Sequence, residues 1–70
     1  MNSDSFIDIL KGLMIEKDIN QTELASKINV KPSQVSEWLK GKSKPGYDNL
    51  KSLALALDIS ADVLLGIKED

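Results

Sequence analysis

The stretch NQTELASKINVKPSQVSEWLKGK, residues 20–42, places apolar residues at helical spacing twice, with a break at residues 29–32. Before the break, Asn20 followed three residues later by Glu23 is typical of a capping box, in which each side chain accepts the other residue's backbone N–H. The apolar residues that follow share one helical face: Leu24, Ala25 and Ile28. We therefore predict a short helix over residues 21–28.

The break itself predicts a sharp turn between two helices. Asn29 is, after Gly, the residue that most readily takes positive φ, so it can end the first helix. Val30 supplies an apolar anchor, and Pro32 suits the first turn of a second helix because that turn leaves its first N–H groups unpaired anyway. Lys31 is a poor N-cap, so the second helix is expected to begin at Pro32 or to slip to Ser33.

The helix after the break has two different faces. Its apolar face is expected to pack on the core through Val35, Trp38 and Leu39. At about 100° per residue, the opposite face carries polar side chains: Ser33, Glu37 and Lys40, flanked by Gln34 and Ser36. Trp38 could stack on a nucleic-acid base, but its spacing with its apolar neighbours favours core packing.

Helical spacing continues on both sides of this stretch. The N-terminal helix is expected to end near Asp18, with Ser3, Asp4 or Ser5 as its N-cap. Its apolar residues are Phe6, Ile9, Leu10, Leu13 and Met14. A fourth helix is expected to begin near Tyr47 and to pack through Leu50, Leu53, Ala54 and Leu57.

The chain is expected to close with a short fifth helix. Ser60 is a suitable N-cap for it, and Gly66 is expected to stop it after Val63, Leu64 and Leu65. No segment shows the alternation of a β-strand. We therefore predict an all-α fold, a compact five-helix bundle around one core, as a single domain over residues 1–70.

The composition limits the classes of function. A chain of 70 residues has little room for a deep pocket, and it contains neither Cys nor His. We therefore expect no metal site, no cofactor, no small-molecule substrate and no enzymatic activity, since no constellation of carboxylates, Lys and Ser suggests catalysis. No apolar run is long enough to span a membrane and residues 1–10 lack a basic signal region, so a cytoplasmic location is expected.

Charge is distributed unevenly along the sequence. The net charge is −2, but the segment from Lys27 to Lys44 holds five lysines and one acid, a sum of +4, and the remaining four lysines and ten acids sum to −6. A basic segment on an acidic chain can be a footprint for phosphates. On charge alone, a solvated lysine face without a partner explains it equally well.

Taken together, these features resemble the Cro and phage-repressor (XRE) family of helix-turn-helix DNA-binding domains. The resemblance covers residues 6–66. It rests on Gln21, the triplet Glu23-Leu24-Ala25, the spacing of Val35, Ser36 and Trp38, the pair Gly41-Lys42, and the segment from Ser60 to Gly66. Two departures are Asn29, where the family usually has Gly, and the lack of any Arg. The resemblance implies a lambda-repressor-like fold with its helix-turn-helix at about residues 21–40.

The same resemblance implies a function and a set of contacts. The chain would be a transcription regulator, expected to repress, that inserts its third helix into the major groove of a double-stranded DNA operator. The positions that match base contacts are Lys31, Ser33, Gln34 and Glu37, with Pro32 weakened by its missing N–H. Those that match phosphate contacts are Gln21, Lys40, Lys42 and Lys44.

Three of these side chains have a second interpretation. Gln21 could be an ordinary surface residue, although the start of a helix favours an anion. Glu37 could accept the amino group of a cytosine, or it could pair with Lys40 one turn along. Tyr47 could contact a phosphate, but packing on the core is the favoured interpretation.

Self-association and a different class of function complete the expectations. Leu55 points away from the core face of the fourth helix, and Ile67 follows the last helix, so the two could form a weak homodimer that DNA strengthens. Ordinary exposure of both residues is the simpler interpretation. The acidic total and the lack of Arg also suit a protein-interaction or antitoxin-like module on the same scaffold.

Overall fold

The computed structural model describes residues 5–67, and these residues form five helices and no strand. The helices are α1 (Ser5–Glu16), α2 (Gln21–Ile28), α3 (Pro32–Lys40), α4 (Tyr47–Leu57) and α5 (Ala61–Leu64). The expected all-α fold of five helices is confirmed. No helix within residues 5–67 is long and apolar enough to cross a membrane.

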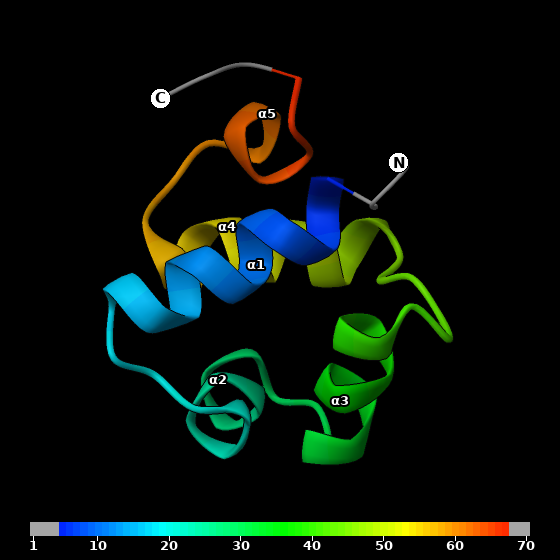
Figure 1. Ribbon diagram of the computed structural model, residues 1–70. Helices are drawn as coiled ribbons and strands as arrows, with labels where there is room; N and C mark the ends of the chain where they lie inside the picture. The colour runs from blue at the N-terminus through cyan, green and yellow to red at the C-terminus, as the bar shows by residue number, and fades with distance from the viewer. Residues whose placement is uncertain (1–4, 68–70) are drawn as a thin grey trace.

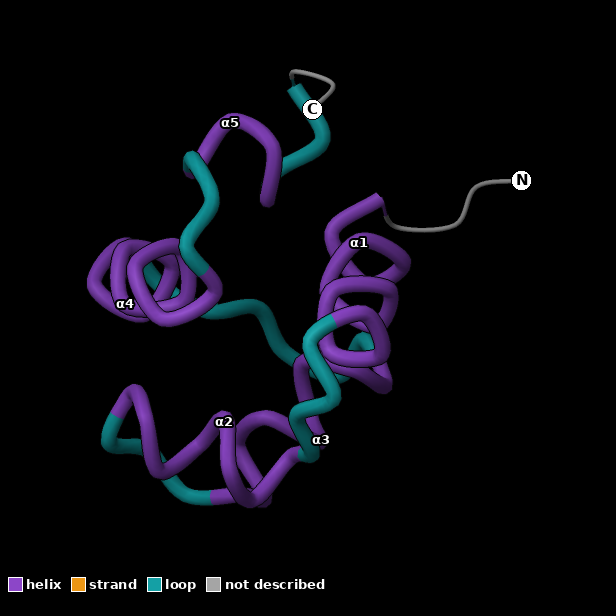
Figure 2. Tube along the Cα trace, turned by 90° about the vertical axis from the view of Figure 1, so that its left-hand side faces the viewer, coloured by secondary structure: helices purple, strands orange, loops and turns teal. Residues whose placement is uncertain are grey.

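The helices surround a single core (Figures 1 and 2). In both views α2 and α3 form one end of the molecule, α5 lies at the opposite end, and α1 and α4 flank the middle. α2 packs on α3 and on α4, while α1 contacts α3 and α5. Residues 20–42, which contain α2, the turn and α3, therefore form one end of the fold.

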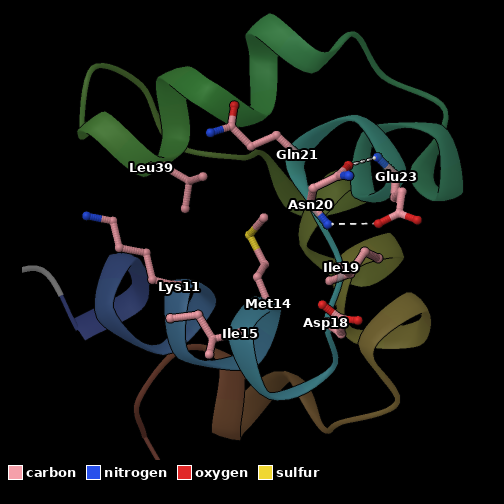
Figure 3. Close-up of a pocket in the computed structure, with 9 residues that line it drawn as sticks. All are labelled: Lys11, Met14, Ile15, Asp18, Ile19, Asn20, Gln21, Glu23 and Leu39. Atoms are coloured by element: carbon pink, nitrogen blue, oxygen red, sulfur yellow. Dashed lines mark hydrogen bonds between the residues drawn. The ribbon is translucent and has the colours of Figure 1, made fainter.

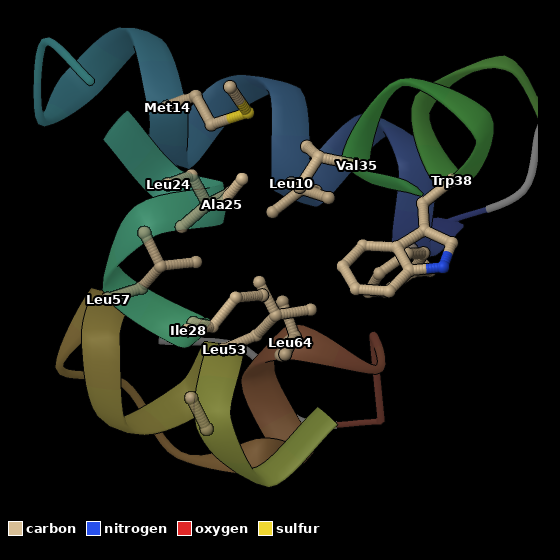
Figure 4. Packing of buried hydrophobic residues seen from close by; sticks show 12 residues of the cluster. Leu10, Met14, Leu24, Ala25, Ile28, Val35, Trp38, Leu53, Leu57 and Leu64 are labelled. Carbon is tan, nitrogen blue, oxygen red and sulfur yellow. The ribbon is translucent and has the colours of Figure 1, made fainter. Parts of the chain in front are cut away.

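Apolar side chains from every helix meet in this core (Figure 4). Its fully buried large residues are Trp38, Leu10, Leu24, Leu53, Leu57, Leu64 and Val35. No polar or charged residue among the described ones is buried. The helical spacing thus identified the core correctly, since burial of this apolar surface is the main force that holds such a domain together.

The C-terminal end of α1 differs from expectation. α1 ends at Glu16 rather than near Asp18, because Asp18 takes a left-handed conformation (φ 53°) and the Ile19 N–H donates to the Met14 carbonyl at 2.9 Å. Ser5 is the first helical residue of α1 and therefore not its N-cap, and the other candidate caps, Ser3 and Asp4, lie outside the described residues.

α3 begins at Pro32, so the slip to Ser33 is wrong. Lys31 occupies the N-cap without a side-chain hydrogen bond, as its chemistry requires.

The last helix confirms its predicted cap but ends one residue earlier than expected. Ser60 Oγ accepts the Val63 N–H at 3.2 Å, and Gly66 takes positive φ (77°) just past the end. Leu64 is fully buried, but Leu65 lies beyond the helix and is exposed. A helix of four residues presents one narrow face to the core, which leaves Leu65 outside it.

Candidate nucleic-acid interface

The start of α2 is held by the predicted capping box. Asn20 Oδ1 accepts the Glu23 N–H at 2.8 Å, and Glu23 Oε1 accepts the Asn20 N–H at 3.0 Å. These bonds leave the N–H groups of Gln21 and Thr22 without an acceptor in the helix, because first-turn donors have none. Gln21 is exposed, so its side-chain amide and these two N–H groups face solvent together.

The turn between α2 and α3 is built as the sequence predicts. Asn29 is left-handed (φ 62°, ψ 45°), and the Val30 N–H donates to the Ala25 carbonyl at 2.9 Å. Val30 is half-buried against the core, where it anchors the turn. Asn29 thus takes the left-handed conformation that a glycine usually takes at this position, since Asn tolerates positive φ better than other side chains.

α3 presents one buried and one exposed face. Val35 is fully buried and Trp38 is 1% exposed, so the core interpretation of Trp38 is confirmed and base stacking is excluded in this conformation. Leu39 is only half-buried. On the outer side the structure exposes Lys31, Pro32, Ser33, Glu37 and Lys40, with Gln34 and Ser36 partly covered. Of the four residues expected to contact bases, Ser33 and Glu37 are exposed on the outer side of α3, Lys31 is exposed at its N-cap, and Gln34 is partly covered.

A tight turn ends α3 and begins the basic loop. Gly41 is left-handed (φ 78°), and a Cβ there would lie 3.3 Å from Ile7 Cδ1. The Lys42 N–H donates to the Glu37 carbonyl at 3.0 Å, which folds the chain back toward the helix. Lys40, Lys42 and Lys44 are all exposed, and none forms an ion pair with a described residue. Their charges are therefore available to an outside partner.

Glu37 has a different neighbour from the one considered in the sequence. No ion pair joins it to Lys40, so that interpretation is wrong. Instead the Ser43 hydroxyl donates to Glu37 Oε1 over a long distance of 3.5 Å. The contact depends on the turn at Gly41, which places residue 43 beside residue 37, and a helical pairing rule cannot foresee it.

Gln21 lies beside an open pocket of about 620 Å³ between α1, α2 and the end of α3 (Figure 3). Leu39, Met14 and Ile19 supply apolar lining, and Lys11 stands across from Gln21. Asp18 and Glu23 also line the pocket, so its charge is mixed. Lys11 was missed in the sequence because it lies outside the basic segment and reaches this site only through the packing of α1.

The phosphate candidates do not all gather at one place. Lys44 lines a separate hollow of about 200 Å³ with Phe6, Pro45, Leu50 and Leu65, and none of these residues lines the pocket beside Gln21. No group of three or more His, Cys, Asp or Glu that could hold a metal ion occurs within residues 5–67. The candidate surface is thus an extended stretch of α2, α3 and the following loop.

Tyr47 overturns one expectation. It is 78% exposed at the start of α4, so the core interpretation is wrong. Gly46, the N-cap of α4, has no side chain to accept a bond, so the first N–H groups of α4 have no cap. A sequence signal did exist, because the core face of α4 runs through Leu50, Leu53 and Leu57 and residue 47 lies at its margin.

Comparison with known proteins identifies this arrangement. A family model described as helix-turn-helix matches residues 10–64. The chain belongs to the Cro/phage-repressor (XRE) helix-turn-helix family. The 26 kDa repressor protein of Escherichia phage HK022 is 38% identical over 50 residues, which are 71% of this chain and 21% of that protein.

Two further relatives extend the comparison. The HTH-type transcriptional activator BcrR of Enterococcus faecalis is 30% identical over 64 residues, 91% of this chain and 31% of that protein. The crystal structure of a transcriptional regulator from Listeria innocua is similar with a TM-score of 0.82 and 28% identity, over 93% of this chain and 61% of that chain. This chain of the XRE family thus spans about a fifth to a third of the length of the two sequence relatives.

Proposed function

We propose that this chain is a sequence-specific regulator of transcription that binds double-stranded DNA and inserts α3 into the major groove. The observation that carries the proposal is the exposed polar face of α3, a helix that lies at one end of the fold (Figure 1). An α-helix fits the major groove, and only side chains on its outer face can reach base edges there. One relative is a repressor and another an activator, and we propose repression as the first hypothesis.

Within this proposal, Lys31, Ser33, Gln34 and Glu37 contact bases. Lys and Gln can bond guanine and adenine, Ser either purine, and Glu the cytosine amino group. The exposure of Ser33 and Glu37 on α3 and of Lys31 at its N-cap supports the assignment, and Gln34 must turn outward from a partly covered position. Pro32 at the start of the helix offers no N–H, so backbone recognition there begins at the next residue.

Phosphate contacts are proposed at the start of α2 and at the end of α3 with the loop that follows it. Gln21 and the two first-turn N–H groups beside it supply donors at the first place, and Lys40, Lys42 and Lys44 supply charge at the second. Tyr47, an exposed residue in the uncapped first turn of α4, is a further candidate. The lysines are free of described ion pairs, so binding would release counterions without first breaking a salt bridge.

We further propose a weak homodimer that DNA strengthens. Leu55 on α4 is 74% exposed and Ile67 after α5 is 73% exposed, and both lie outside the core. Two such side chains bury far less than the roughly 1,200 Å² of a stable interface, so the contact would need the support of two adjacent half-sites. A DNA-binding role also agrees with the cytoplasmic location expected from the sequence.

Selection from random duplexes tests the proposal. The chain should enrich a pool with two related half-sites in inverted orientation, as a two-fold symmetric dimer requires. A variant with Ser33 and Gln34 both changed to Ala serves as a matched control, because it alters the reading face without altering charge. This control should retain salt-dependent binding but lose the sequence preference, whereas an unenriched pool would contradict the proposed function.

A protein-interaction module remains the second candidate. The net charge of −2 and the absence of Arg favour it, because bidentate Arg is the commonest specific contact to guanine. The salt dependence of duplex binding separates the two, since a chain that neutralises Z phosphates should show a log–log slope of about −0.9Z. A slope near zero would favour the interaction module.

A further inference from the structure

The turn at the end of α3 fixes the place of one hydroxyl. Gly41 closes the helix in a left-handed conformation, and the Lys42 N–H bonds back to the Glu37 carbonyl. Four residues after the glycine, Pro45 is buried. Ser43 is therefore held between two anchored points, and it is itself partly covered. The turn therefore brings the side chain of Ser43 beside the last turn of α3.

This hydroxyl meets the carboxylate of Glu37. Ser43 Oγ lies 3.5 Å from Glu37 Oε1, and the other carboxylate oxygen has no described partner. A carboxylate accepts hydrogen bonds through both oxygens, so a donor on Oε1 leaves Oε2 able to accept another. The contact with Ser43 thus involves only one carboxylate oxygen of Glu37, and the second oxygen can still accept a hydrogen bond.

The orientation of the Glu37 carboxylate matters because its neighbours in the sequence include several lysines. Lys40 is one helical turn away, at the spacing where a Glu and a Lys on a helix normally attract each other. In the structure this pair is absent, and the carboxylate is beside the serine instead. The carboxylate thus lies beside Ser43 and forms no ion pair with Lys40, whose charge stays available.

We propose that Ser43 is a positioning residue for DNA recognition, which orients Glu37 toward a base-edge amino group and keeps it from pairing with Lys40. The inference rests on the proposed function and deepens it, because it names how the one acid of the basic segment reads a base. The cytosine N4 amino group is the donor that a carboxylate accepts in the major groove. Ser43 itself needs no contact with DNA.

The test uses the operator recovered by selection and every single-base change of it. Glu37→Ala first identifies the base pair whose discrimination depends on the carboxylate. Ser43→Ala should then lower discrimination at that same base pair by about two- to tenfold, the range for one hydrogen bond. Ser43→Thr should restore it, since threonine keeps the hydroxyl, and the slope of affinity against salt should not change because no charge is removed.

A double variant and a control make the result specific. In a Glu37→Ala background, Ser43→Ala should have no further effect, because the carboxylate that it orients is gone. Ser52→Ala serves as the control, since Ser52 on α4 is also partly covered and makes no described side-chain hydrogen bond. It should leave discrimination at every position unchanged.

The possible failures can be told apart. A chain that binds no duplex DNA overturns the proposed function and this inference together. Sequence-specific binding in which Ser43→Ala changes nothing, or changes all positions equally, overturns the inference alone. An equal effect of Ser43→Ala with and without Glu37 also overturns it, because the serine would then act through another group.

Discussion

Trp38 is the residue on which the stability of α3 most depends. Its ring is almost fully buried, and its Nε1 has no hydrogen-bond partner among the described residues. The ring contributes a large apolar surface, but a buried donor without an acceptor costs about 1–3 kcal/mol. Packing of the Trp38 ring therefore stabilises the fold, while its unpaired N–H destabilises it.

Two substitutions separate these terms. Trp38→Ala should lower the free energy of unfolding by about 3–5 kcal/mol, a large part of the roughly 4–10 kcal/mol expected for a domain of this size. Trp38→Phe should cost clearly less, because it keeps most of the apolar contact and removes the unpaired N–H. Urea unfolding followed by circular dichroism measures both, since the only tryptophan is the fluorophore that is lost. Equal costs would contradict an unpaired indole.

At the scale of the element, α2 depends on its cap. With only eight residues it is too short to be stable by itself, so the two bonds of the capping box matter to it. Asn20→Ala should reduce the free energy of unfolding by about 0.5–2 kcal/mol. Thr22→Ala is a matched control in the same turn, because Thr22 makes no described side-chain bond, and urea unfolding should show it close to the parent chain. Equal losses in both variants would mean that the cap bonds contribute nothing.

Local signals explain which elements could be predicted from the sequence. The capping box at Asn20, the left-handed Asn29 and the Ser60 cap each depend on a few neighbouring residues, and all three are present as predicted. The exposure of Tyr47, the bond from Ser43 to Glu37 and the place of Lys11 beside Gln21 depend on how turns and helices pack. Helical spacing places residue 47 only at the margin of the core face of α4, and it carries no information about contacts between a loop and a helix or between two helices. The sequence therefore misplaced Tyr47 and missed the other two contacts.

For the whole molecule, the distribution of charge determines how DNA binding should respond to salt. Lys42→Ala or Lys44→Ala should weaken binding to every sequence and reduce the magnitude of the salt slope by about one unit each. Lys51→Ala is the control, because Lys51 is equally exposed but lies on α4, outside the basic segment. Titrations of a labelled duplex at several salt concentrations give the slopes. An unchanged slope would remove that lysine from the footprint.

The proposed dimer is also a property of the whole molecule. α4 packs on α2 and α5, whereas α3 packs on α2 and α1, so contact through Leu55 on α4 would leave the outer face of α3 open (Figure 2). Leu55→Lys places a charge where an apolar contact is proposed, and the same charge repeated across a two-fold axis repels itself. Sedimentation should then show less association than for the parent chain, and DNA binding should lose cooperativity between half-sites.

Ile15→Lys adds the same charge at an equally exposed apolar residue of α1 and should sediment like the parent. Equal association of Leu55→Lys and the parent chain at all concentrations would place the interface elsewhere.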